Sequence, residues 1–265
     1  MKPTSIITLL IFFIASTVGR AQPEVIVWGQ NISSQLNVPA EATNVIALAA
    51  GDAHCLALRR DGSVIAWGGN SVGQATVPAE ATNIVSIAAG SSHSMGLRSN
   101  GTILFWGRII PANVDYVPLE ATNVVALALG PGAQHAMALR ADGTVVDWGN
   151  SLHGLTNIPA TAVNIVNVAA GAFHSLALRA DGKVVSWGNN TQGQLNVPAA
   201  ATNIVAIACG WYDNAALRAD GTMLVWGALS PPPTSYGFTN LVDVACPFNT
   251  MFSGNSVLAL RRNGT

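Results

Sequence analysis

The sequence has little charge, few cysteines and no long apolar run, and each shortage excludes a class of protein. Charged residues make up 9% of the 265 residues, and 12 basic residues against 13 acidic ones leave a net charge of −1. Such a chain has no global field that would attract DNA, an anionic membrane or an acidic substrate. Three cysteines are too few for a disulfide framework, so we expect Cys55, Cys209 and Cys246 to be small buried side chains.

The most extended apolar segment lies at the N-terminus, where Lys2 precedes a run from Ile6 to Ala15. This run is well short of the ~20 residues that a membrane-spanning helix needs. A basic residue, a short apolar run and the small residues around Arg20 are typical of a secretory signal peptide. We therefore predict that residues 1–21 are a signal peptide and that residues 22–265 form the secreted or periplasmic protein, free of the membrane after cleavage.

A Trp-Gly pair recurs six times, with spacings of 39, 39, 42, 39 and 39 residues. A period of this length is typical of propellers and solenoids. We expect the tryptophans to be structural and to pack between neighbouring repeats, because each large indole can bury much apolar surface. They are Trp28, Trp67, Trp106, Trp148, Trp187 and Trp226.

Each repeat predicts three short strands, as the unit that runs from Asn44 to Trp67 illustrates. An apolar run ends at Gly51, a second run ends at Arg59, and Asp61-Gly62 precedes a third run that ends at Trp67. Asp-Gly and Asn-Gly pairs favour tight hairpins, and apolar runs of four to seven residues rich in Val and Ile are too short for helices. A looser fourth segment surrounds the proline of each unit, which suits a sheet edge.

The fold class that follows is all-β, because a single small sheet cannot bury both of its faces and the repeats must stack face to face. Radial stacking gives a β-propeller, here of six blades of about 39 residues. The chain stops at Thr265, where the last repeat still needs a third strand, and Val25–Trp28 has the pattern of that strand. We expect this N-terminal strand to complete the last blade. A solenoid is the alternative, and it would not require complementary ends.

Several repeat motifs resemble the regulator of chromosome condensation repeat. They include Trp67-Gly-Gly-Asn70 followed by Gly73-Gln74, and Gly171-Ala-Phe-His174. The short unit with Val-Pro-Ala, as at residues 38–40, is similar to the secreted bacterial branch of that family, which includes beta-lactamase inhibitor protein II. The resemblance implies a propeller, usually of seven blades. It implies no single activity, since members act in nucleotide exchange on a small GTPase, chromatin binding or enzyme inhibition.

Repeated polar residues offer candidates for chemistry, and most have a structural explanation. His54, His93, His135 and His174 share one register, but equivalent positions in different blades are related by a rotation and cannot share one metal ion away from the axis. The arginines two residues before each turn, such as Arg59, are expected to bind turn carboxylates or carbonyl groups. No unique acid and base pair remains. We therefore predict a non-enzymatic protein with no catalytic residue, no metal and no cofactor.

The segment around Ser71 matches the Gly-x-Ser-x-Gly nucleophile elbow, which requires a strand, a sharp turn and a helix. Here the serine lies in the loop after a Trp-Gly pair, and no helix is predicted to follow it. The match is therefore interpreted as a feature of the repeat.

The residues that differ between repeats carry the functional hypothesis. The loop after the first strand is small in early repeats, but the last three contain Phe173, then Trp211, Tyr212 and Asp213, then Phe248. Aromatic side chains beside polar ones are typical of protein-binding hot spots. The alternative is that these rings fill the mouth of the channel. We predict an exported, monomeric module that binds another protein, and no nucleic acid, through the rim loops of blades four to six.

Two rival functions stay open. The first is an inhibitor of a secreted or periplasmic enzyme, in line with the family resemblance. The second is a propeller hydrolase or a carbohydrate-binding protein, and a hydrolase would need a pair of carboxylates at the axis.

Overall fold

The structure is a computed structural model, and it describes residues 10–13, 25–28, 31–108, 116–130, 132, 135–228, 239–246 and 258–261. Five antiparallel sheets of three strands follow one another along the chain. They are β3 (Val45–Ala50), β4 (His54–Arg59) and β5 (Val64–Gly68); β6 (Ile84–Ala89), β7 (His93–Arg98) and β8 (Ile103–Gly107); β9 (Val124–Ala128), β10 (His135–Arg140) and β11 (Val145–Gly149); β12 (Ile165–Ala170), β13 (His174–Arg179) and β14 (Val184–Gly188); and β15 (Ile204–Cys209), β16 (Asp213–Arg218) and β17 (Met223–Gly227).

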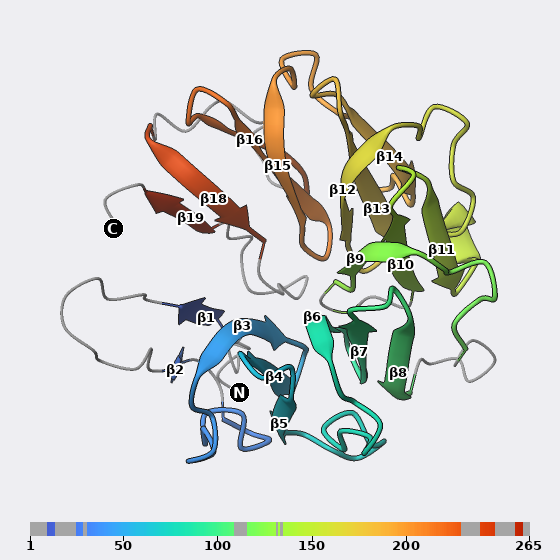
Figure 1. The fold of residues 1–265 in the computed structure, drawn as a ribbon. Helices are drawn as coiled ribbons and strands as arrows, with labels where there is room; N and C mark the ends of the chain where they lie inside the picture. The colour runs from blue at the N-terminus through green and yellow to red at the C-terminus, as the bar shows by residue number, and fades with distance from the viewer. Residues whose placement is uncertain are drawn as a thin grey trace, which may run out of the picture.

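These sheets stand around a common axis, with the first strand of each sheet innermost (Figure 1). The first strands contact one another from sheet to sheet, and each also contacts the second strand of the preceding sheet. The predicted all-β propeller is therefore confirmed. A further two-stranded sheet, β18 (Leu241–Ala245) with β19 (Leu258–Arg261), follows the fifth full sheet. The described residues around Pro39, Pro78, Pro118, Pro159 and Pro198 form turns and coil, consistent with the looser fourth segment expected from the sequence.

The pairing of the N-terminal strand differs from the expectation. β2 (Val25–Trp28) pairs with β1 (Leu10–Phe13), with Leu10 opposite Trp28 and Phe13 opposite Val25. Among the described strands, β19 pairs with β18 alone. Among the described strands, Val25–Trp28 therefore pairs with β1 and not with the last sheet, which corrects the predicted pairing for the uncleaved chain. Because β1 lies within residues 1–21, completion of the last blade after removal of that segment stays a prediction. The blade number of six stays a prediction.

Five of the six repeated tryptophans have described side chains, and these are buried where neighbouring sheets pack together. Trp67, Trp106, Trp148, Trp187 and Trp226 are all at most 6% exposed. Four of these five indoles donate a hydrogen bond to a backbone carbonyl 32 residues earlier, for example from Trp67 Nε1 to Gln35 O at 2.8 Å. The side chain of Trp28 lies outside the described residues.

The hairpin turns also follow the predicted chemistry. Gly62 has a φ of 81°, and the Asp61 carboxylate accepts a hydrogen bond of 3.0 Å from the backbone N–H of Ser63. Asp142 and Asp220 accept equivalent bonds from the threonines two residues on. These carboxylates therefore hold turns, and the hydrogen bonds lower their pKa values.

The three cysteines are free and buried, as expected. In the part of the chain that the structure describes, no helix is long and apolar enough to span a membrane.

Candidate functional site

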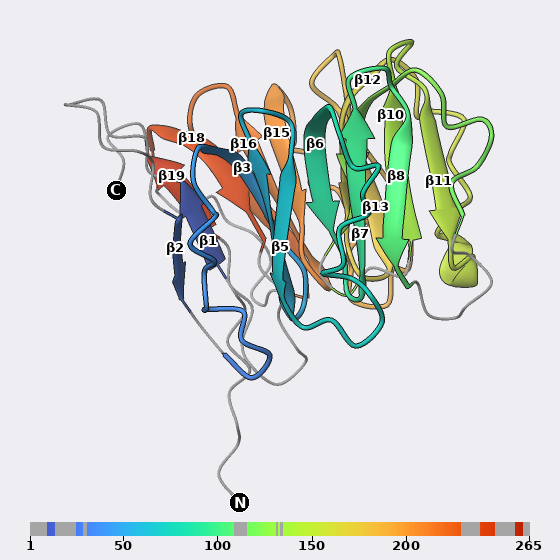
Figure 2. The ribbon, with the colours of Figure 1, turned by 60° about the horizontal axis from the view of Figure 1, so that its bottom comes forward.

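The two ends of the propeller differ in their connections. One end, the turn end, carries the tight hairpins between second and third strands. The other end, the loop end, carries the links between first and second strands and the short 3₁₀ helix η1 (Leu152–Gly154), which lies at the lower end of the sheets in the side view (Figure 2).

Aromatic residues from two neighbouring sheets meet at the loop end. Phe173 lies between β12 and β13, whereas Trp211 and Tyr212 lie between β15 and β16. The ring centroids of Phe173 and Tyr212 are 5.9 Å apart, those of Trp211 and Tyr212 are 6.0 Å apart, and those of Phe173 and Trp211 are 6.4 Å apart. His153 of η1 approaches Phe173 edge-on at 6.3 Å. We call Phe173, Trp211, Tyr212 and His153 the aromatic cluster.

The aromatic cluster is partly open to solvent. The three large rings are half-buried, His153 is exposed, and its neighbour Leu152 is 63% exposed. The rings of Trp211 and Tyr212 lie nearly parallel, with 14° between their planes. Mutual packing fixes their orientation, so little side-chain entropy is lost when a ligand covers them. Such a preorganised apolar surface is suited to docking and does not by itself provide chemistry.

A glycine after the first strand of each three-stranded sheet allows the loops to converge. A Cβ atom at Gly171 would lie 2.7 Å from the carbonyl oxygen of Gly210 and 2.5 Å from the His174 ring. Any side chain there would force two blades apart, and this close approach brings the loop of Phe173 next to the loop of Trp211.

The predicted site residues have different positions. Phe173, Trp211 and Tyr212 come together as described, whereas Asp213 is only 4% exposed and occupies the register of the buried histidines. Asp213 therefore does not contribute to the exposed surface, because it is the first residue of β16 and its side chain lies between blades. Phe248 lies outside the described residues. Leu152 and His153 were not among the predicted site residues, although the pattern of their loop departs from that of the other repeats.

The repeated histidines connect neighbouring blades. His54 Nε2 lies 2.9 Å from Ser94 Oγ, His135 Nε2 lies 2.8 Å from Ser175 Oγ, and His174 Nε2 lies 2.7 Å from Asn214 Oδ1. These contacts confirm the structural role predicted for three of the four histidines. Burial lowers their pKa values, to about 4 for His54 and His174 and to about 3 for His135. The imidazoles are therefore neutral at physiological pH.

One buried cluster has the residue types of a catalytic triad but not its arrangement. Asp147 Oδ2 accepts hydrogen bonds from Trp187 Nε1 at 3.0 Å and from Ser175 Oγ at 3.3 Å, and His135 contacts the same serine. The serine lies between the acid and the histidine, and both Ser175 and His135 are fully buried. A substrate cannot reach this hydroxyl, so the cluster serves the contact between blades.

Loops of the first and third blades are joined at the loop end. Asp52 Oδ1 accepts a hydrogen bond of 3.0 Å from the backbone N–H of Gly132, 80 residues away. Burial raises the pKa of Asp52, although the side-chain bond to Ser91 and the bond from Gly132 oppose that shift. The loop end is therefore bridged on one side by a polar contact and carries the aromatic cluster on the other.

Charge is unevenly distributed between the two ends. Most charged residues with described side chains lie toward the turn end. The exceptions are Asp52, Arg108, Asp147 and Asp213. The turn end carries basic and acidic residues in nearly equal number: Arg59, Arg60, Arg98, Arg140, Arg179, Lys183 and Arg218, and Glu41, Asp61, Glu80, Glu120, Asp142, Asp181, Asp220 and Asp243.

The described residues contain no group of three or more histidines, cysteines and acids that could hold a metal ion. The backbone around Ser71 forms turns, and a helix does not follow it before the next strand, so the nucleophile-elbow match is a feature of the repeat.

Comparison with known proteins agrees with this architecture. Residues 45–74, 84–108 and 165–194 match the Regulator of chromosome condensation (RCC1) repeat. No curated protein matches the chain. Among solved structures, Prp20p from Saccharomyces cerevisiae is 20% identical, with a TM-score of 0.68, and the match covers 99% of this chain and 80% of that one.

Two further structures have similar folds. The ectodomain of the Physcomitrella patens receptor kinase CR4 is 19% identical, with a TM-score of 0.74, and the match covers 97% of this chain and 71% of that one. Human WBSCR16 is 21% identical, with a TM-score of 0.65 and coverage of 84% and 79%. The chain is thus a β-propeller, and the matching stretches are repeats of the RCC1 type.

Proposed function

We propose that this chain is an exported, non-enzymatic module that binds another protein through the aromatic cluster. The observation that carries the proposal is the stack of Phe173, Tyr212 and Trp211, three half-buried rings from neighbouring blades beside the exposed Leu152. Aromatic anchors that are rigid before binding are typical of hot spots in protein interfaces. Similar folds also support a protein partner: the Prp20p structure was reported with binding to Gsp1p and histones, and yeast RCC1 was solved bound to Kap60.

Export is a separate part of the proposal, and it rests on the basic residue and apolar run of residues 1–21 and on the resemblance to the secreted bacterial branch. It is tested by N-terminal sequencing of the protein recovered from the medium or the periplasm. A mature N-terminus at Gln22 supports export, whereas a chain that keeps Met1 in the cytoplasm contradicts it.

The binding experiment compares three forms of the protein as bait for the organism's envelope and medium fractions. They are the natural chain, the Trp211→Ala/Tyr212→Ala variant, and a control variant, Ile32→Ala. Ile32 is 82% exposed in the loop before β3 and lies outside the aromatic cluster. The expected result is a partner that the natural chain and the control retain and the double variant loses. Retention by all three forms contradicts the proposed site.

Inhibition of a secreted or periplasmic enzyme is a narrower form of the same proposal. It is tested by adding the protein, at nanomolar concentration, to an assay of any enzyme captured in this way. Loss of enzyme activity with the natural chain but not with the double variant would identify the module as an inhibitor.

A carbohydrate ligand is the second candidate, and the nearly parallel rings of Trp211 and Tyr212 favour it, because sugar rings pack against flat aromatic faces. The two candidates are separated by a glycan array probed with the natural chain and the double variant. Binding of a neutral glycan that the double variant loses would replace the protein partner with a carbohydrate.

A further inference from the structure

The turn end, opposite the aromatic cluster, has two features that the proposed function does not use. One is a ring of exposed apolar side chains, and the other is an arrangement of fixed charges of both signs.

The apolar ring consists of one β-branched residue from the first strand of each sheet, with exposures between 41% and 54%: Ile46, Val85, Val125, Val166, Val205 and Val242. Each is the second residue of its strand and is skipped in the pairing register, so it forms a β-bulge. A bulged residue is left unpaired and its side chain is redirected. Isolated exposed valines are ordinary, but six at one register form a repeated apolar surface around the axis.

The arginines of the turn end are held in place by backbone carbonyls. Arg59 donates to Glu41 O, Arg98 donates to Glu80 O at 2.8 Å, and Arg218 donates to Ala200 O at 2.6 Å. The aspartates of the turns are fixed by the turns themselves, as described above. Most blades thus present a positive and a negative group close together, and both are ordered before any partner arrives.

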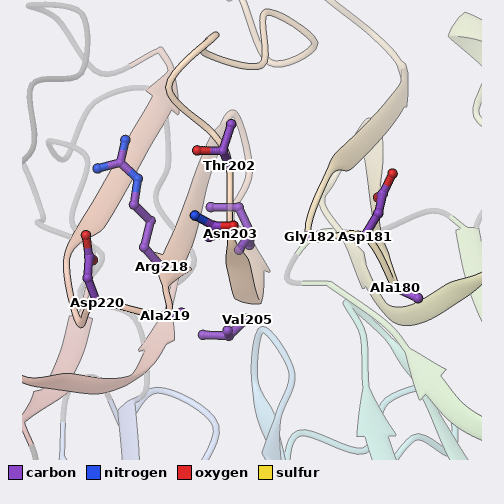
Figure 3. A pocket seen from close by; sticks show the side chains of 10 residues that line it. Ala180, Asp181, Gly182, Thr202, Asn203, Val205, Arg218, Ala219 and Asp220 are labelled. Atoms are coloured by element: carbon purple, nitrogen blue, oxygen red, sulfur yellow. The ribbon is translucent and has the colours of Figure 1, made fainter.

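A cavity of about 710 Å³ between two hairpins shows how a partner could enter this surface. It lies between the turn of Asp181 and the turn of Asp220, and Val205 of the apolar ring contributes to its lining (Figure 3). Arg218 and Asp220 lie on one side of this cavity and Asp181 on the other. The cavity therefore offers both signs of charge beside an apolar wall.

We propose that the turn end is a self-association surface, where two copies of this chain pack with their turn ends face to face. Near-equal numbers of fixed positive and negative groups disfavour nucleic acid or an anionic membrane, which would require an excess of positive charge. A two-fold interface places the same surface of both copies in contact, so a charged surface is complementary to itself only if it carries both signs, and the turn end does. The apolar ring would become buried at the centre of such an interface.

The size that a dimer requires sets a condition on this surface. A stable interface buries about 800 Å² per partner. The apolar ring is surrounded by the hairpins of five sheets, whose tips belong to the same end of the propeller and would add to the contact area. The arrangement leaves the two aromatic clusters at opposite ends of the dimer, so that one dimer could hold two partners. The proposed dimer differs from the monomer expected from the sequence. The sequence pattern did not indicate the apolar ring, because the bulges that expose it depend on how the backbone strands pair.

Sedimentation velocity of the full chain, from about 1 to 100 µM, tests this inference. The natural chain is expected to change from monomer to dimer as its concentration rises. Val166→Glu and Val205→Glu place a carboxylate on exposed ring positions, and each is expected to weaken dimerisation at least tenfold. Ile32→Glu, an equally drastic change at an exposed residue of the loop end, is the matched control and should leave the dimerisation constant unchanged.

Three results would overturn the inference. They are a monomer at every concentration, a dimer that neither glutamate variant weakens, and a dimer that Ile32→Glu weakens as strongly as the ring variants do. Circular dichroism of each variant confirms that its fold is retained. The result does not depend on the partner of the aromatic cluster, and the Trp211→Ala/Tyr212→Ala variant should dimerise like the natural chain.

Discussion

The Nε2 atom of His54 lies 2.9 Å from the hydroxyl of Ser94 in the next blade, and this hydroxyl in turn donates to the carbonyl of Gln74 at 2.9 Å. All three residues are buried. The contact therefore joins consecutive repeats through polar groups that have no access to water. Loss of the serine hydroxyl would leave His54 Nε2 unsatisfied, although the Gln74 carbonyl would keep its bond from Trp106 Nε1. A buried unsatisfied group costs more than the loss of an ordinary surface hydrogen bond.

Replacing Ser94 by alanine should therefore destabilise the propeller. We expect Ser94→Ala to lower the free energy of unfolding by about 1–3 kcal/mol, because His54 Nε2 would be buried without a partner. Urea denaturation followed by tryptophan fluorescence measures the change. A variant as stable as the natural chain would show that the contact contributes nothing.

At His93 a missing hydrogen-bond partner can be added instead of removed. Neither of its ring nitrogens has a hydrogen-bond partner, and the repeat position equivalent to Ser94, Ser175 and Asn214 in the following blade is Ala136. Ala136→Ser places a hydroxyl where the other blades have a polar partner. We expect the free energy of unfolding to rise by about 1 kcal/mol, with a higher Tm. Unchanged or lower stability would mean that the third blade cannot bring the two groups together.

The sequence predicted the parts of this fold that a local pattern determines. Asp61-Gly62 specifies a hairpin because glycine tolerates the positive φ there, and the register of Trp67 and Arg59 follows from that hairpin. It did not predict that Ile46 is exposed, because a bulge depends on how β3 pairs with β4. Asp213 was misplaced for a similar reason: adjacency to Tyr212 indicated a loop, but the strand begins at Asp213 and turns its side chain inward.

The aromatic cluster was predicted in part. Phe173 and Trp211 are 38 residues apart, one residue short of the repeat period, so the sequence placed them in equivalent loops but not at the same register. Their contact across blades depends on the close packing of Gly171 against Gly210, which only the structure reveals. The sequence also did not show that charged residues of both signs gather at the turn end, because the overall composition is nearly neutral.

The four buried histidines should make the protein sensitive to acid. Burial lowers the pKa to about 4 for His54 and His174 and to about 3 for His93 and His135, against 6.5 for the unperturbed group. Between about pH 6.5 and 4, the unfolded chain binds protons that the folded chain does not bind, so stability falls as the pH falls. Four such sites give a slope on the order of 5 kcal/mol per pH unit.

Urea midpoints measured from pH 7.5 to 4.5 test this dependence. Replacing His174 by glutamine should lower the slope by about one quarter, because one titrating site is removed. A stability that stays constant down to pH 5 would contradict the burial of neutral histidines.

Asp147 should produce a pH dependence of the opposite sign. Burial raises the pKa of its carboxyl well above the usual value, although the hydrogen bonds from Trp187 and Ser175 oppose that shift. As the pH rises from the unfolded pKa of about 3.9 towards the folded one, the unfolded chain ionises first and stability falls. Asp147→Asn removes this ionisation and keeps an oxygen that can accept from the Trp187 indole.

We therefore expect Asp147→Asn to be more stable than the natural chain at pH 7 by at least about 1 kcal/mol, with little difference near pH 4. The same urea series measures both values. Asp61→Asn is the control, because Asp61 is exposed and the hydrogen bonds from Ser63 lower its pKa, so it has no raised ionisation to remove. Equal stability of the natural chain and Asp147→Asn across this range would mean that the folded protein does not raise the pKa of Asp147. The unpartnered Oδ1 of its buried carboxyl argues against that outcome.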